Sequence, residues 1–213
     1  MMAHELSPAD RQKVTVAITT AEKSTRGEIV AVAARQSDDY RHVPLHVATA
    51  LALAVPLIVP VYNHYFPWTA IGITSLFVIQ LCVFILAALL LSLPALRYHI
   101  TPRSLMRKYA ARNAAQQFLA LNTSSTQGRT GVLIFVSILE RYVEIIGDTG
   151  ITSKVDQRDW QKIVDDMLPL LAKRQISDAM VLGVERCGAE LAQHFPPGKS
   201  NPNELPDRFI VLN

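Results

Sequence analysis

The sequence predicts an α/β sandwich, a small mixed sheet flanked by helices, that is interrupted by a two-helix transmembrane hairpin. The first observation is a gap in charge: the chain has 21 Lys/Arg and 18 Asp/Glu in 213 residues, yet the 54 residues from Val43 to Leu96 contain none. The second is that short apolar runs rich in β-branched residues stand on both sides of this gap, between segments of helical spacing. This composition excludes a wholly soluble protein and a wholly intramembrane one.

The uncharged block is long enough for two membrane-spanning helices, since each needs about 20 apolar residues. Four aromatic residues and a proline cluster between Tyr62 and Trp68, and aromatic side chains favour the membrane–water interface. The block 43–96 is therefore predicted to be a hairpin with spans at about 45–62 and 69–93. At 1.5 Å per residue these spans are about 27 Å and about 37 Å long.

Cations flank the block on both sides, while the turn between the spans has none. The positive-inside rule then places both termini and the folded domain in the cytoplasm, as in a multi-pass protein of the bacterial inner membrane. The first residues lack the charged-then-apolar pattern of a secretory signal. Five cations follow the block without an intervening acid and are expected to contact anionic lipid headgroups: Arg97, Arg103, Arg107, Lys108 and Arg112.

The piece before the block, residues 6–42, is predicted to contain one helix and one strand. Ser7 can cap the helix, Pro8 suits its first position, and Asp10 favours the positive end of the helix dipole. The apolar run Glu28–Ala34 is typical of a buried strand. One helix and one strand cannot bury a core alone, so this piece needs a partner.

The piece after the block, residues 97–195, supplies that partner. A helix is predicted from Thr101-Pro102 to about Leu121, and two strands follow as a hairpin. Two more helices follow the strands, the second capped by Ser177. The predicted strands are Gly131–Ser137 and Tyr142–Ile146, and a turn is predicted at 147–150. Residues 196–213 are predicted to be a loop-like tail that ends in a short apolar run.

The hairpin is inserted after the first strand and before the helix that crosses to the second. The carboxyl ends of these two strands are therefore expected to face the membrane. By the same connectivity, Glu140-Arg141 is expected at that edge of the sheet and Asp148 at the opposite edge.

Three segments resemble the TPM-domain family: Gly27–Val32, Gly131–Ser137 and Glu140–Ile151. The most specific part is the Glu-Arg-aromatic-Val-Glu-Ile strand, followed by Gly-Asp and Gly-Ile. The likeness covers most of residues 6–195 outside the hairpin. It extends to a bacterial subgroup of membrane proteins in which a two-helix hairpin interrupts the domain.

The resemblance implies the same α/β sandwich. Members of the wider family are associated with photosystem repair and with modulation of membrane receptors, and acid-phosphatase activity and calcium binding have been attributed to some of them. Those relatives mostly hold the domain outside the cytoplasm. The cation pattern of this chain places it inside, where calcium is scarce.

The candidate metal ligands are Asp38, Asp39 and Asp148. Adjacent carboxylates after a strand can supply hard oxygen ligands to Ca²⁺ or Mg²⁺, and the resemblance places Asp148 in the family's turn. The alternatives are a solvated loop for the Asp38-Asp39 pair and turn capping for Asp148. Asp38 and Asp148 are expected at opposite ends of the sheet, so they do not share one ion.

No phosphate-binding loop, zinc-protease motif, Cys-x-x-Cys or nucleophile elbow occurs in the sequence. The predicted function is a membrane-anchored, non-catalytic interaction factor that assembles or maintains membrane protein complexes. A metal-dependent acid phosphatase is the alternative, so enzymatic activity stays open. The predicted partners are the bilayer and unidentified membrane proteins, and not nucleic acid, because the cations lack interleaved aromatics. Gln80, inside the second span, is expected to hydrogen-bond across the hairpin or to another copy of the chain.

Overall fold

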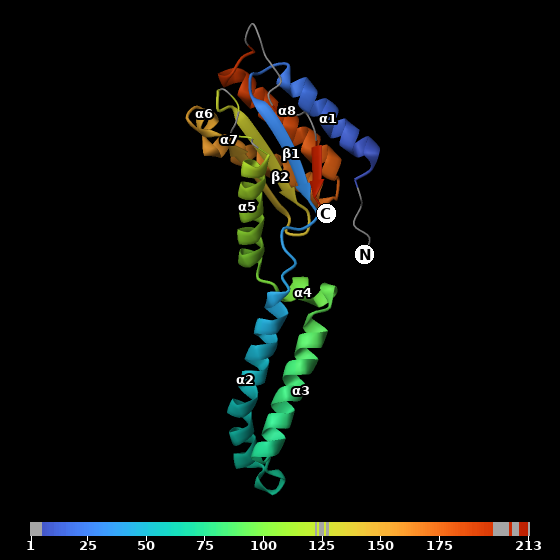
Figure 1. Ribbon diagram of the computed structural model, residues 1–213, viewed down its shortest axis with the longest axis vertical. Helices are drawn as coiled ribbons and strands as arrows, with labels where there is room; N and C mark the ends of the chain where they lie inside the picture. The colour runs from blue at the N-terminus through green and yellow to red at the C-terminus, as the bar shows by residue number, and fades with distance from the viewer. Residues whose placement is uncertain are drawn as a thin grey trace. The chain divides into compact units, whose positions relative to one another are not determined.

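A computed structural model describes residues 6–121, 123, 126, 128–197, 205 and 209–212 (Figure 1). The chain divides into two compact units. The first comprises Met1–Ser37 and Arg107–Asn213 and contains the sheet, and the second comprises Asp38–Met106 and contains the apolar hairpin. The boundaries of the second unit lie a few residues outside the uncharged block. Segments on both sides of the hairpin therefore build one sheet, which confirms the predicted fold class.

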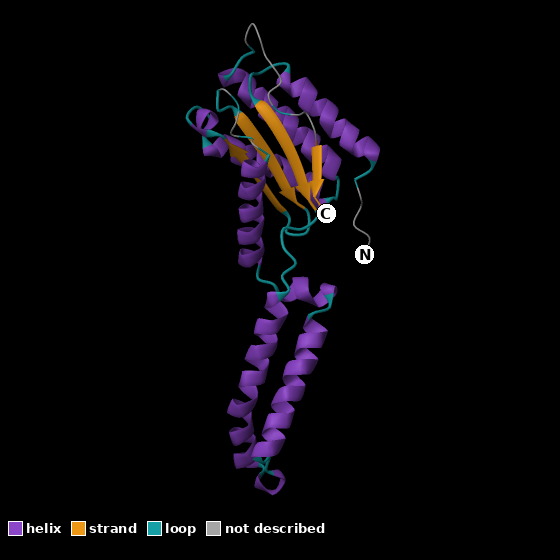
Figure 2. Ribbon diagram, viewed as in Figure 1, coloured by secondary structure: helices purple, strands orange, loops and turns teal. Residues whose placement is uncertain are grey.

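The sheet has four strands in the order β3-β2-β1-β4 (Figure 2). Their bounds are Glu28–Ala34 for β1, Gly131–Ser137 for β2, Tyr142–Gly147 for β3 and Phe209–Leu212 for β4. Strand β1 is parallel to β2 and β4, while β2 and β3 form an antiparallel hairpin. The first two strands have the predicted bounds, because every one of their residues is buried and their composition is correspondingly apolar throughout.

The loop-like tail is a prediction that the structure corrects. The apolar run at its end is strand β4, which pairs with β1 from Ala31↔Phe209 to Ala34↔Leu212. A four-residue run can be recognised as a strand only through the partner edge that β1 offers, and that edge belongs to a segment far away in the sequence.

Helices cover the two faces of the sheet unequally (Figure 1). The helices of this unit are α1 (Pro8–Glu22), α5 (Arg103–Ala120, which begins at the boundary), α6 (Thr149–Thr152), α7 (Gln157–Ala172) and α8 (Ile176–His194). Helices α1, α7 and α8 pack on the face that carries Ile29 and Ile134. Helix α5 lies on the face that carries Val30 and Phe135 and buries only alanines, Ala110 and Ala114. The main core therefore lies on the three-helix face.

Helix α1 begins as predicted, with a capping box in which the Ser7 hydroxyl accepts the Asp10 N–H and the Asp10 carboxylate accepts the Ser7 N–H. The predicted cap of the last helix is wrong. Gln175 is the N-cap of α8, without a side-chain cap hydrogen bond among the described residues. Ser177 lies inside the first turn of α8, two residues after the N-cap position.

The hairpin unit contains α2 (His42–Tyr65), the short 3₁₀ helix η1 (Pro67–Thr69), α3 (Ile73–Leu91) and α4 (Pro94–Ile100). Helices α2 and α3 are long and apolar enough to cross a membrane, and no described residue of α3 is buried. The Asn63 side chain closes the turn, since its amide nitrogen donates to the Ile71 carbonyl (3.1 Å) and its oxygen accepts the Ile71 N–H (2.8 Å).

The relative lengths of the two apolar helices are the reverse of the prediction. Helix α2 has 24 residues and α3 has 19, which correspond to about 36 Å and about 29 Å. Helix α2 starts earlier than expected because Pro44 falls in its first turn, where a missing N–H costs no hydrogen bond. Helix α3 starts later because Gly72, in an extended conformation, precedes it. Helix α4 was not predicted.

Candidate functional site at the two edges of the sheet

A buried carboxylate organises the edge of the sheet where β1 and β2 end. Glu140 is 9% exposed. Its Oε1 accepts the Ser37 N–H at 2.9 Å, and its Oε2 accepts the Ser137 hydroxyl at 2.5 Å. The Ser37 and Ser137 hydroxyl oxygens lie 2.8 Å apart. We call Ser37, Ser137 and Glu140 the Glu140 clasp, because it joins the segment before the hairpin to the segment after it.

The β2–β3 turn holds Glu140 in this position. Arg141 has a φ of 51°, the left-handed conformation that reverses the chain. Before it, the N–H of Ile138 donates to the carbonyl of Ala34 (3.0 Å) and that of Leu139 to the carbonyl of Arg35 (3.1 Å). Because Ser137 is fully buried, its hydroxyl cannot reach a substrate, and the arrangement has a structural role. Glu140 was predicted at this edge of the sheet but without a role of its own. The available signal was an acid directly after the apolar residues Ile138 and Leu139.

Asp148 lies at the opposite edge, where β2 begins. Its N–H donates to the Gly131 carbonyl at 2.9 Å, and its Oδ1 accepts the Thr149 N–H at 2.6 Å. Asp148 is 5% exposed, and its second oxygen, Oδ2, is buried without a hydrogen-bond partner in the described part of the chain. The predicted turn at 147–150 is therefore the start of α6, which Asp148 caps, as aspartate often does. The prediction that Glu140 and Asp148 occupy opposite edges is confirmed.

The loop next to Asp148 approaches α6 closely. The Gly150 N–H donates to the Arg129 carbonyl at 3.1 Å. A Cβ at Gly150 would lie 2.5 Å from the Gly128 oxygen and 2.6 Å from the Arg129 oxygen. These main-chain oxygens leave no room for a side chain at position 150, which explains the glycine.

Asp38 and Asp39 belong to the hairpin unit and have partners close in sequence. The Asp38 Oδ1 accepts the Tyr40 N–H at 2.7 Å, which supports the left-handed φ of 51° at Tyr40. Asp39 Oδ2 lies 3.1 Å from a guanidinium nitrogen of Arg41. Among the described residues, no group of three or more His, Cys, Asp or Glu side chains could hold a metal ion. The structure thus does not gather the predicted ligands around one point.

Two further buried carboxylates accept hydrogen bonds from backbone amides of the same unit. Glu22 Oε1 accepts the Ile29 N–H at 2.7 Å, and Glu28 Oε2 accepts the Leu205 N–H at 3.3 Å. Both glutamates are less than 10% exposed. Burying a carboxylate costs free energy unless the carboxylate is hydrogen-bonded. These hydrogen bonds therefore explain how the domain accommodates two buried glutamates. Neither glutamate was predicted as a candidate site residue.

A half-buried pair lies on the α5 face of strand β3. The Tyr142 hydroxyl donates to Glu144 Oε2 at 2.9 Å. Burial raises the pKa of the Glu144 carboxyl above its usual range, and the hydrogen bond from Tyr142 opposes that shift. Burial is also the main cause that raises the pKa of Tyr142, followed by the same hydrogen bond. Tyr142 therefore keeps its proton and remains the donor at neutral pH.

The five predicted lipid-contacting cations lie on α4 and α5. Arg103, Arg107, Lys108 and Arg112 are exposed along α5. Arg97 belongs to α4, and its guanidinium carbon lies 5.3 Å from the centre of the Tyr98 ring. None of the ion pairs within the described residues involves these five side chains. Their charges are therefore not neutralised by acids of this chain in the described part of it.

Comparison with known proteins gives a family match for the segment that follows the hairpin. Residues 96–190 match the TPM domain family. These residues therefore resemble a TPM domain. The match runs from α4 into α8 and so contains β2, β3 and the Asp148 turn. Helix α1 and strand β1 precede the match, and β1 belongs to the same sheet. The domain that contains most of the match is therefore folded from two segments that the hairpin separates.

A solved structure is similar to the whole chain. It is the NMR structure of the BA42 protein from the psychrophilic bacterium Bizionia argentinensis, with a TM-score of 0.61 and 19% sequence identity. The alignment covers 99% of this chain and 98% of that one. At this identity the likeness concerns the fold alone. A comparison with curated proteins gives no match.

Proposed function

We propose that this protein is a membrane-anchored TPM domain that acts as a non-catalytic interaction factor, helping to assemble or maintain membrane protein complexes. The observation that carries the proposal is that the buried carboxylates are occupied by hydrogen bonds within the domain. Glu22, Glu28, Glu140 and Asp148 each accept a hydrogen bond from a backbone N–H of the domain itself. An active site instead needs titratable groups that converge on a cleft, and these acids are divided between two edges of the sheet.

The apolar hairpin supports a location in the bacterial inner membrane, with α2 and α3 as the two spans. The positive-inside rule orients them, with both termini and the TPM domain in the cytoplasm. The exposed cations of α5, together with Arg97, are proposed to contact anionic headgroups, at about 1 kcal/mol for each cation near the surface.

Thiol labelling in intact cells tests this orientation. In a Cys82→Ala background, Trp68→Cys places a thiol at the exposed turn of the hairpin, and Lys108→Cys places one on α5. A membrane-impermeant maleimide is expected to label position 68 in intact cells and position 108 only after permeabilisation. Labelling in the reverse order would contradict the proposed topology.

Crosslinking in native membranes, followed by purification, tests the interaction function. We expect the full-length chain to carry a reproducible set of membrane proteins, and Asp38→Asn and Asp148→Asn to retain that set. Hydrolysis of a phosphomonoester by the same samples is expected to equal the background. Recovery of the chain alone with stoichiometric metal, or hydrolysis that Asp148→Asn abolishes, would overturn the proposal.

One observation favours the alternative, a metal-dependent phosphatase. The buried Asp148 Oδ2 lacks a hydrogen-bond partner among the described residues, and a carboxylate oxygen of this kind can bind a hard cation. The fit is poor, however, because Ca²⁺ takes six to eight oxygen ligands, and Asp148 belongs to no group of three or more His, Cys, Asp or Glu side chains in the described part of the chain. The experiment above distinguishes the two functions.

A further inference from the structure

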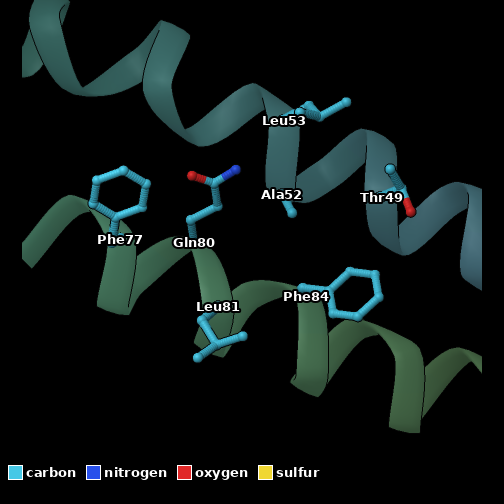
Figure 3. A pocket seen from close by; sticks show the side chains of 7 residues that line it. All are labelled: Thr49, Ala52, Leu53, Phe77, Gln80, Leu81 and Phe84. Atoms are coloured by element: carbon cyan, nitrogen blue, oxygen red, sulfur yellow. The ribbon is translucent and has the colours of Figure 1, made fainter.

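The hairpin contains a groove between its two apolar helices. Its volume is about 350 Å³, and Figure 3 shows its walls. Helix α2 contributes the small residues Thr49 and Ala52, and α3 contributes Phe77, Gln80 and Phe84. The Gln80 side chain extends toward α2, so the one amide of this groove faces an apolar wall.

The Gln80 amide has no hydrogen-bond partner among the residues that the structure describes. The hydroxyl of Thr49, on the α2 wall of the groove, donates instead to the Leu45 carbonyl at 2.8 Å, within its own helix. Gln80 lies seven residues into α3, about 10 Å from the start of the helix and thus well inside the span. A polar group that stays unpaired in hydrocarbon costs several kcal/mol, so a partner from outside the hairpin is expected.

We propose that the partner is a second copy of this chain, which docks on the groove face through a pair of Gln80 amides. The inference rests on the proposed membrane location. All copies insert with the same topology, so a twofold axis along the membrane normal brings Gln80 of both chains to one depth. A primary amide carries both donors and an acceptor, so two Gln80 side chains satisfy each other. An unrelated helix would need a polar residue at the matching depth.

Gln80 is only half-buried in the hairpin, and Phe77 and Leu81, which line the groove beside it, are exposed. The groove therefore leaves the amide open to a second chain. A single polar residue at a contact between helices fixes the register of the partners.

Disulfide crosslinking of the full-length chain in native membranes locates the contact. In a Cys82→Ala background, Gln80→Cys is expected to form a disulfide-linked dimer on mild oxidation. The wild-type chain, with Cys82 as its thiol in α3, is the matched control. Cys82 lies about 200° around α3 from Gln80, so the wild-type chain is expected to stay monomeric on oxidation. Equal crosslinking at both positions, or crosslinks at position 80 only to other proteins, would refute the proposed dimer.

The strength of association gives a second readout. In vesicles of defined lipid, fluorescence energy transfer between labelled chains measures the dimer dissociation constant. Gln80→Leu is expected to weaken the dimer about tenfold, the effect of removing two interhelical hydrogen bonds, while Cys82→Leu leaves it unchanged. A chain that stays monomeric at all protein-to-lipid ratios, with a lipid in the groove, would overturn the inference. The labelling at positions 68 and 108 tests the membrane topology independently. A failure of the proposed topology can therefore be distinguished from a failure of the proposed dimer.

Discussion

Replacing Glu140 with alanine is expected to lower the free energy of unfolding of the sheet-containing domain by about 3–5 kcal/mol. Each hydrogen bond to a charged group is worth about 1.5–3 kcal/mol, and the Glu140 clasp contains two. The substitution also leaves the buried Ser137 hydroxyl without its carboxylate acceptor. The effect is large because the clasp joins two segments that the hairpin separates.

Urea unfolding of the full-length chain in detergent measures this loss. The chain has two tryptophans, of which Trp160 is buried in the domain core and Trp68 is exposed in the hairpin turn. A Trp68→Phe background therefore makes the fluorescence specific for the domain. Glu185→Ala, an exposed change on α8, is the matched control and is expected to shift stability by less than about 0.5 kcal/mol. If Glu140→Ala behaved like Glu185→Ala, the proposed role of the clasp would be wrong.

Gly188→Leu is expected to destabilise the domain by about 3 kcal/mol, at the upper end of the usual cost of overpacking. A Cβ at Gly188 would lie 2.7 Å from the Ala21 Cβ, so α1 and α8 touch almost backbone to backbone. Helix α1 precedes the hairpin in the chain, and α8 follows it. A larger side chain at this position therefore separates the two segments of the domain.

The neighbouring residue supplies the control for this substitution. Ala189 is exposed on the same helix, so Ala189→Leu adds similar bulk without meeting α1. We expect the same unfolding assay to show a loss for Gly188→Leu, an intermediate loss for Gly188→Ala and almost none for Ala189→Leu. Equal stability of the two leucine variants would show that the close approach of α1 and α8 is unimportant.

The parts of the fold that local patterns encode were predictable. Strands β1 and β2 are buried on both faces, so their sequences are continuous apolar runs with unambiguous ends. The capping box of α1 lies within four residues, and its pattern is equally local. Errors arose where a local pattern fits two structures. Ser177 has the side chain of an N-cap but lies two residues after the N-cap of α8, and the Asp148 turn is the start of a short helix.

The candidate sites were less predictable because they depend on residues that are distant in sequence. The Ser37–Glu140 bond joins positions 103 residues apart, and the bond from Leu205 to Glu28 joins positions 177 apart. No local signal distinguishes a buried glutamate that accepts a backbone N–H from a glutamate on a solvated turn. The sequence therefore pointed to Asp38, Asp39 and Asp148 by residue type and resemblance, and did not reveal the role of Glu140.

The sequence by itself determined that an apolar hairpin interrupts the domain and at which edge of the sheet the chain leaves for it. Charge and hydropathy are properties of contiguous residues, and the order of strands along the chain is read directly. Only the tertiary structure decided that β4 completes the sheet and that the buried acids accept hydrogen bonds from backbone amides of their own domain. It also decided that Gln80 faces a groove in which no described residue is its hydrogen-bond partner. These features depend on distances between segments, which folding creates and which the order of residues does not contain.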